Sequence, residues 1–152
     1  MIPKRILLAT DFSENSTAAR ECAADYARAF DAELLILHVV DPSPLGCPIF
    51  HDRVPVDMAE LQKNIEAGAQ QELDSVAADC ASDLRSVRAF YRTGKPAHEI
   101  VAFADEELID LIVMGTHGWT GFKHIILGST AENVVRSANC PVLTVRSANG
   151  AE

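Results

Sequence analysis

A segment toward the C-terminal end of the chain combines glycines with hydroxyl residues at fixed spacing. The segment reads Gly115-Thr116-His117-Gly118 and, after nine intervening residues, Gly128-Ser129-Thr130. Glycine lets backbone amides approach an anion without a Cβ in the way, and a helix start supplies unpaired N–H groups with a partial positive charge. The spacing therefore predicts a site for the phosphate groups of a nucleotide.

Purely structural interpretations of the same residues stay open. Ser129-Thr130-Ala131-Glu132 matches the S-x-x-E capping box, in which Ser129 would cap a helix and the glycines would only connect it to a strand. Asp11 can cap a helix, bind a ligand, or do both. His117 can be a solvated loop residue, a catalytic acid or a phosphate donor, and no neighbour in the sequence orients it.

The elements that must position these residues are visible as short apolar runs. Runs without alternation are typical of parallel strands that are covered on both faces, and they occur at 6–10, 34–40, 111–114 and 141–145. In residues 87–92, Val87, Ala89 and Tyr91 alternate instead with Arg88, Phe90 and Arg92. One face of this segment is therefore more polar, which predicts a strand nearer the edge of the sheet.

Four helices are expected between these strands. The first begins after Asp11 or Ser13, either of which can cap it, and its apolar positions are expected to lie against the sheet: Ala19, Cys22, Ala23, Tyr26 and Phe30. The second begins at Asp57, where Glu60 completes a capping box, and runs for about six turns.

The third helix is expected to have Pro96 at its first position, where the missing N–H costs nothing. The fourth opens at Ser129, and its apolar positions are Val134, Val135 and Ala138. Residues 42–55 contain four prolines without periodicity and are predicted to form a mobile loop.

Five strands that alternate with four helices predict an α/β sandwich with a parallel sheet and right-handed crossovers. In such sheets a ligand binds where the strand order reverses, beyond the carboxyl ends of the strands. If the first and fourth strands are neighbours, Asp11 faces the loop that begins at Gly115.

Composition narrows the class of protein. The chain has 152 residues, a length that predicts one domain. Its formal net charge of −9 argues against nucleic acid or an anionic membrane as a partner. No apolar run approaches the roughly 20 residues that span a bilayer, and acidic residues interrupt any signal-peptide core, so a cytoplasmic location is expected. The four cysteines lack zinc-site spacing and are interpreted as reduced packing residues.

Several of these segments together resemble the universal stress protein family. The resemblance rests on residues 114–118, 128–130 and 139–145, and it extends to 6–13, 37–41 and 94–97. The family's G-x2-G-x9-G-[ST] pattern, which distinguishes its ATP-binding members, is complete here. The resemblance implies a flavodoxin-like (Rossmann-like) sheet in the order 3-2-1-4-5, with ATP between the first and fourth strands and a homodimer formed through the fifth strand.

The resemblance also implies site residues. Thr10 and Asp11 would meet the adenosine end, and the backbone of Val39 would contact adenine. Ribose and phosphates would be lined by Met114, Gly115, His117 and Gly118, and the phosphates would be held by Gly128, Ser129 and Thr130. Magnesium or manganese would bind mainly to phosphate oxygens, since Asp11 is the one obvious local carboxylate and no protein residue is assigned to the metal.

One position departs from the family pattern. Family members that bind ATP often carry arginine directly after the second glycine, whereas this chain has Trp119, with Lys123 and His124 as the nearby cationic candidates. Weaker phosphate binding is expected as a result.

The expected function is that of an ATP-binding universal stress protein with a regulatory or stress-adaptation role. The sequence identifies no protein partner for that role. Two alternatives remain. A slow ATPase is one, although the sequence has no Walker lysine and no evident pair of water-orienting base and arginine. A nucleotide-free dimeric interaction module is the other. One domain is expected over 1–147, followed by a disordered tail at 148–152.

Overall fold

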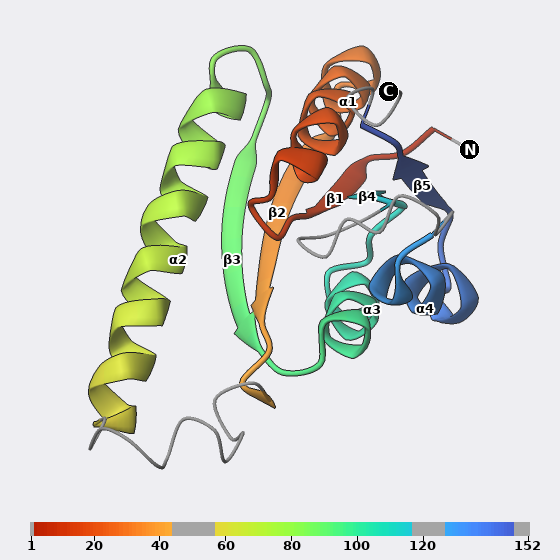
Figure 1. Cartoon of the computed structure of the whole chain (residues 1–152). Coiled ribbons are helices and arrows are strands. Elements are labelled where there is room, and N and C mark those ends of the chain that lie inside the picture. Colours follow the sequence, from red (N-terminus) through yellow and green to blue (C-terminus); the bar gives the residue numbers. More distant parts are fainter. Residues whose placement is uncertain (1, 44–56, 117–126, 148–152) are drawn as a thin grey trace.

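A computed structural model describes residues 2–43, 57–116 and 127–147 of the chain. They form one five-stranded parallel sheet in the order β3-β2-β1-β4-β5, together with four helices (Figure 1). The elements are β1 (Arg5–Ala9), α1 (Glu14–Phe30), β2 (Glu33–Val40), α2 (Met58–Ala81), β3 (Val87–Thr93), α3 (Pro96–Glu106), β4 (Leu111–Gly115), α4 (Ser129–Ser137) and β5 (Val142–Val145). The predicted fold class and strand order are confirmed.

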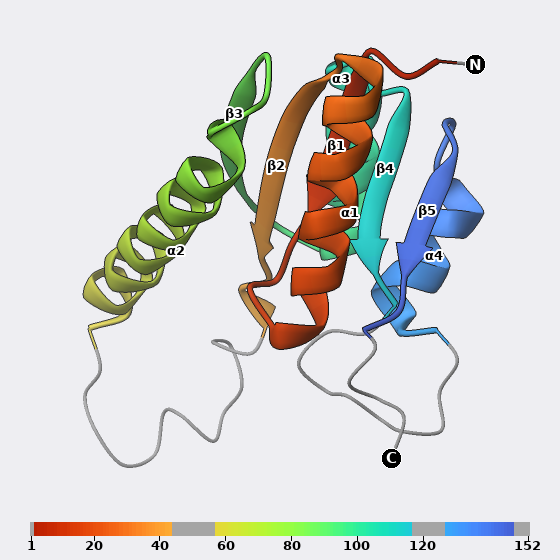
Figure 2. The same ribbon diagram turned by 90° about the horizontal axis from the view of Figure 1, so that it is seen from above.

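The helices cover the sheet in two layers. Helices α1 and α2 pack on one face and α3 and α4 on the other, as Figure 2 shows from above. Neighbouring residues of β1 illustrate the reason, because Ile6 and Leu8 enter the cluster under α1 and α2, while Leu7 and Ala9 enter the cluster under α3 and α4. Both faces of the central strands are therefore buried, which explains their continuous apolar runs.

Strand β3 lies at one edge of the sheet, as its alternating sequence predicts. Its residues are half-buried or exposed, whereas Leu34 to Leu37 of the neighbouring β2 are all buried. The exposed side of β3 carries Arg88, whose guanidinium forms an ion pair with Glu33 at 2.7 Å and another with Glu107 at 3.3 Å. Arg88 thus places an ion-paired, charged side chain on the edge strand.

The prediction for the buried side of α1 is wrong in part. The residues that pack against the sheet are Ser16, Ala19, Ala23 and Ala27. The aromatic residues that were expected there are exposed, Tyr26 at 38% and Phe30 at 40% of their surface. The predicted and the observed sets of buried residues are both spaced three or four positions apart, as one side of a helix requires. Only small side chains let α1 approach the sheet closely.

Two other helices begin as predicted. The Asp57 carboxylate caps α2 by accepting hydrogen bonds from the backbone N–H groups of Ala59 at 3.0 Å and Glu60 at 3.3 Å. Pro96 is the first residue of α3. The predicted mobile loop, apart from its first two residues, and the predicted disordered tail at 148–152 lie outside the described residues.

Two packing details complete the fold. On α4, Val134 is fully buried as expected, but Val135 is 47% exposed, so the predicted apolar side of that helix is wrong at this position. The cysteines within the described residues, Cys22, Cys80 and Cys140, are free thiols. Burial raises the pKa of the Cys80 thiol, which is consistent with a packing role.

Candidate functional site

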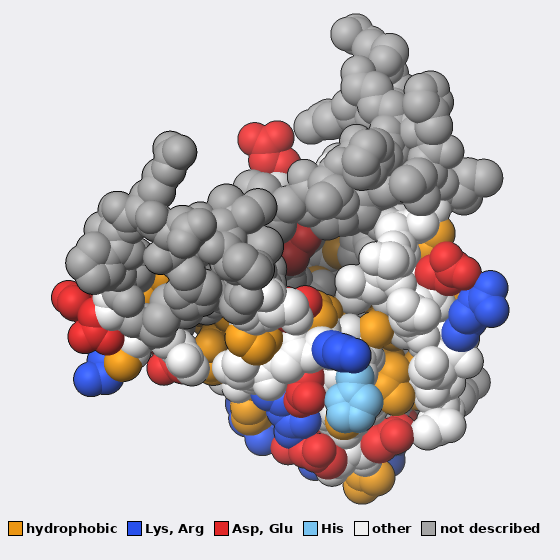
Figure 3. All heavy atoms as spheres, turned by 60° about the horizontal axis from the view of Figure 1, so that its bottom comes forward, with side chains coloured by type: hydrophobic (Ala, Val, Ile, Leu, Met, Phe, Trp, Pro, Cys, Tyr) orange, Lys and Arg blue, Asp and Glu red, His pale blue; other side chains and the backbone are white. Residues whose placement is uncertain are grey.

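The carboxyl ends of β1, β2 and β4 border a cavity of ≈ 340 Å³ on the α3 and α4 side of the sheet. The strand order changes direction at β1, which pairs with β2 on one side and with β4 on the other, so this is the switch point at which α/β folds bind ligands. Figure 3 shows a hollow on this side of the molecule, with hydrophobic side chains at its border.

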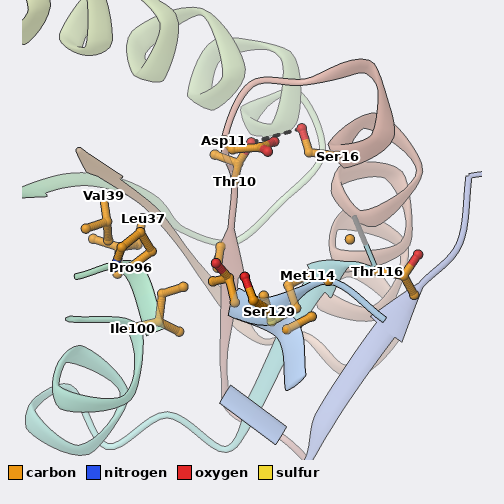
Figure 4. Close-up of a pocket in the computed structure, with 15 residues that line it drawn as sticks. Thr10, Asp11, Ser16, Leu37, Val39, Pro96, Ile100, Met114, Thr116 and Ser129 are labelled. Atoms are coloured by element: carbon orange, nitrogen blue, oxygen red, sulfur yellow. Dashed lines mark hydrogen bonds between the residues drawn. The ribbon is translucent and has the colours of Figure 1, made fainter. Parts of the chain in front are cut away.

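Eight of the ten predicted site residues line this cavity. They are Thr10, Asp11, Val39, Met114, Gly115, Gly128, Ser129 and Thr130. The close-up in Figure 4 shows Thr10, Asp11 and Ser16 together on one side, with Leu37, Val39 and Pro96 on another. The remaining two predicted residues, His117 and Gly118, lie outside the described residues, as do Trp119, Lys123 and His124.

The backbone of Val39 faces the cavity because β2 extends beyond β1. Successive residues of a parallel strand direct their N–H and C=O groups to alternate sides. The Leu37 carbonyl accepts from Thr10 N–H at 3.0 Å on the β1 side, and the Val40 carbonyl accepts from Gly94 N–H at 2.9 Å on the β3 side. Val39 therefore directs one donor and one acceptor toward the β1 side, where that strand has already ended.

Apolar side chains form the wall beside Val39. Leu37 of β2, together with Pro96 and Ile100 of α3, lines this part of the cavity. Sequence reasoning missed these three residues, although Pro96 carried a signal as the first residue of a helix on the same face of the sheet. An apolar slot with a backbone donor and acceptor at its edge suits a flat heteroaromatic ring.

The start of α4 borders the opposite part of the cavity. Gly128 is the N-cap residue, its N–H donates to the Thr116 carbonyl at 2.7 Å, and its own carbonyl accepts from Glu132 N–H at 2.9 Å. No side chain among the described residues caps the helix, and Ser129 is its first residue rather than its cap. The capping-box interpretation of Ser129 is therefore wrong.

This arrangement leaves the first turn of α4 suited to bind an anion. The unpaired N–H groups of a helix start and the positive end of its dipole favour negative charge, and Gly128, Ser129, Thr130 and Ala131 all line the cavity. None of the described lining residues is lysine or arginine. Any phosphate held by these described residues must rely on backbone N–H groups and hydroxyls.

A network of side chains shapes the segment that leaves β1. The Asp11 carboxylate accepts from the Ser13 N–H at 3.0 Å and from the Ser13 hydroxyl at 2.6 Å. The Thr10 hydroxyl accepts from Phe12 N–H at 3.1 Å and donates to the Ser16 hydroxyl at 3.1 Å. Ser13 stands at the N-cap of α1, but its side chain bonds to Asp11 instead of capping the helix. Ser16 lines the cavity and was not predicted to do so.

His38 supports this segment from the other face of β2. Its Nδ1 lies 2.8 Å from the Thr10 carbonyl oxygen, and its ring stacks on Phe12 with 4.2 Å between the ring centroids. Burial lowers the pKa of His38, and the Thr10 carbonyl and the Asp11 carboxylate partly oppose that shift. The imidazole is therefore neutral at neutral pH.

No metal site is built from protein side chains in the described part of the chain. Within it, no group of three or more histidine, cysteine, aspartate or glutamate residues is arranged to hold an ion. Asp11 supplies the one carboxylate among the described residues that line the cavity. A divalent ion there would need oxygen ligands from a bound phosphate as well.

The family model for the universal stress protein family matches residues 3–146. This chain belongs to the universal stress protein family. Universal stress protein MJ0531 of Methanocaldococcus jannaschii is 39% identical over 144 residues, which cover 94% of this chain and 82% of that protein.

Solved structures of family members share the fold. The structure of MJ0577 from the same organism superposes with a TM-score of 0.85 at 32% identity and covers 98% of this chain and 99% of its own. A universal stress protein in complex with cAMP has a TM-score of 0.69 at 24% identity, with coverage of 97% and 100%. Helices that could span a bilayer are absent from the described residues.

Proposed function

We propose that this universal stress protein binds ATP in the cavity at the ends of β1, β2 and β4 and acts as a nucleotide-dependent regulatory or stress-adaptation protein. The observation that carries the proposal is the placement of two complementary features on one cavity. The backbone of Val39 offers a donor and an acceptor beside an apolar slot, and the start of α4 offers N–H groups to an anion.

The base end favours adenine over guanine. Adenine presents an amino donor next to a ring acceptor, which match the carbonyl and the N–H of Val39. Guanine presents a carbonyl and a ring N–H at the same positions. Its carbonyl would face the carbonyl of Val39, and its ring N–H would face the N–H of Val39. A binding site rejects an analogue strongly when binding that analogue would leave buried polar groups unpaired.

The phosphate end supports binding of moderate strength. Backbone N–H groups of α4 and the hydroxyls of Ser129 and Thr130 can hold phosphate oxygens, while the described lining residues contribute no cationic side chain. We expect a dissociation constant on the order of micromolar or weaker, equivalent to about −8 kcal/mol or less favourable. Asp11 and the phosphates together would supply oxygen ligands for Mg²⁺ or Mn²⁺.

Binding rather than rapid turnover is the proposed role. The cavity shows no lysine or arginine among its described residues, and phosphoryl transfer normally uses such groups to neutralise charge.

A cytoplasmic homodimer that pairs through β5, the edge strand beyond β4, belongs to the same proposal. The complex with cAMP of a family member supports an adenine nucleotide as the ligand.

Calorimetric titration of the whole chain with MgATP and MgGTP tests the proposal. We expect measurable heat and a raised melting temperature with ATP, and an affinity for GTP at least about tenfold lower. The exposed substitution His98→Ala on α3 serves as a control that leaves ATP binding unchanged, since its side chain is 77% exposed and does not line the cavity. Absence of heat and of thermal stabilisation at millimolar ATP would exclude the proposed function.

A further inference from the structure

His38 connects the two parts of the site that a nucleoside would touch. It lies in β2 between Leu37 and Val39, both of which line the cavity from the α3 and α4 side. Side chains alternate along a strand, so the imidazole lies on the opposite face, the one that α1 and α2 cover. There it contacts Thr10 and Phe12, which belong to the segment between β1 and α1.

The contacts of the ring are directional. A backbone carbonyl can only accept a hydrogen bond, so the 2.8 Å contact with Thr10 places the proton of the neutral imidazole on Nδ1. The stack on Phe12 is close to parallel, with 29° between the rings. Phe12 has a φ of 61°, a left-handed conformation that is unfavourable for residues other than glycine, so the contacts around it must offset a local strain.

The space between His38 and α2 is not closely filled. On that side His38 borders a second hollow of ≈ 410 Å³, whose other described lining residues include Ile65, Gly68 and Glu72 of α2. The hydrogen bond to Thr10 and the stack on Phe12 therefore add side-chain contacts between β2 and the segment carrying Asp11 to the backbone hydrogen bond from Thr10 N–H to the Leu37 carbonyl.

We propose that His38 is a positioning residue, whose Nδ1–H acts with the backbone hydrogen bond from Thr10 to Leu37 to set the separation between the base-binding backbone of Val39 and the Thr10–Asp11 segment, and so tunes the cavity to the length of a nucleoside. The inference rests on the proposed function, in which Val39 binds the base, and it takes the Thr10–Asp11 segment to contact the adenosine end of the ligand. His38 itself does not line that cavity and does not touch the ligand.

The consequence is selective for ligands that contact both parts. Adenosine and ATP span Val39 and Asp11, so a change in their separation lowers the affinity for both. Adenine alone needs only the β2 side of the cavity, and inorganic tripolyphosphate without a divalent ion needs only the start of α4. A general loss of structure would instead weaken all four ligands together.

Four purified full-length proteins test this: wild type, His38→Ala, His38→Asn and His38→Gln. Asparagine places an amide N–H where Nδ1 lies, whereas glutamine extends its amide toward the position of Nε2. We expect His38→Ala and His38→Gln to weaken ATP and adenosine about tenfold while adenine and tripolyphosphate change less than about twofold. His38→Asn should restore ATP affinity to within about threefold of wild type.

Calorimetry measures ATP and adenosine, and ligand-observed NMR measures adenine and tripolyphosphate. Equal ATP affinity in wild type and His38→Gln would overturn the positioning role, and so would a parallel loss of all four ligands in a folded variant. If His38→Ala fails to fold, the comparison of the asparagine and glutamine variants decides. A wild-type protein that binds no ATP would refute the proposed function instead, which keeps the two failures distinct.

Discussion

The Thr10 hydroxyl donates a hydrogen bond to the Ser16 hydroxyl over 3.1 Å, and this contact joins the end of β1 to the first turn of α1. The Ser16 hydroxyl in turn donates to the Ser13 carbonyl at 2.7 Å. Both Thr10 and Ser16 line the cavity, so the wall on this side is held by hydroxyls that already have protein partners. Rigid walls of this kind lower the cost of ordering a site when a ligand binds.

Substitution of Ser16 by alanine should lower stability. The change removes one donor and one acceptor at a position that is only 6% exposed, while the higher helix propensity of alanine returns a small part of the loss. We expect a decrease in the free energy of unfolding of about 1 kcal/mol, measured by urea denaturation. Thr17→Ala, at the exposed neighbouring position, is the matched control. Equal stability of the two variants would show that the hydroxyl network does not contribute.

Gly128→Val should weaken ATP binding without unfolding the protein. The backbone at this position is extended, with φ −70° and ψ 157°, so a branched residue fits the conformation, but its side chain would compete with phosphate for the start of α4. We expect at least about a tenfold loss of ATP affinity by calorimetry, for a cost in folding of about 1 kcal/mol.

Gly68→Val is the control for that experiment. Gly68 is an exposed residue in α2, and nothing lies within 4 Å of an added Cβ there. Its ATP affinity should equal that of the wild type. Unchanged affinity in Gly128→Val would mean that the phosphates do not lie at the start of α4.

Asp57→Ala should destabilise α2 by removing its cap. The carboxylate accepts hydrogen bonds from two N–H groups of the first turn, and loss of such a cap costs about 1 kcal/mol. Asp57→Asn keeps an acceptor oxygen and should lose much less. Chemical denaturation of the three proteins measures the difference, and identical unfolding curves for wild type and Asp57→Ala would contradict the capping role.

The stability of the protein should decrease as pH falls through the range just below 6.5, in part because of His38. Burial holds the pKa of His38 below the ordinary value of 6.5 despite the nearby Asp11 carboxylate, and Glu72 lines the hollow beside the ring. Below that pH the unfolded chain binds a proton more readily than the folded chain, so protonation favours unfolding until the folded-state pKa is passed.

Unfolding free energies of wild type and His38→Asn at pH values of about 7.5 and about 5.5 isolate this contribution. The wild type should lose more stability between the two pH values than the variant, which cannot titrate at this position. A larger loss in His38→Asn would show that the sign of the pKa shift is wrong. The exposed His98→Asn substitution controls for the loss of a histidine elsewhere.

Rules that depend on neighbouring residues predicted several helix starts correctly. They failed where two different sets of residues fitted the same sequence pattern. Asp57 and Pro96 were predictable because a cap and a first-position proline depend on a few neighbouring residues. Tyr26 fits the same periodicity as Ala27, and only contact with the sheet shows that the small side chain is the buried one. In the same way Ser129 satisfies a capping-box pattern, but the chain enters α4 with Gly128 at the cap.

The order of apolar runs and amphipathic segments determined by itself that this protein is an α/β sandwich of five strands and four helices. Burial on one or two faces gives each strand or helix its own spacing of apolar residues in the sequence. Periodicity says nothing about which strands are neighbours, and here the order came from the family resemblance. Only the tertiary structure decided that Ser16, Leu37 and Ile100 border the cavity. These residues belong to three separate elements, and they meet because parallel strands end at one edge of the sheet.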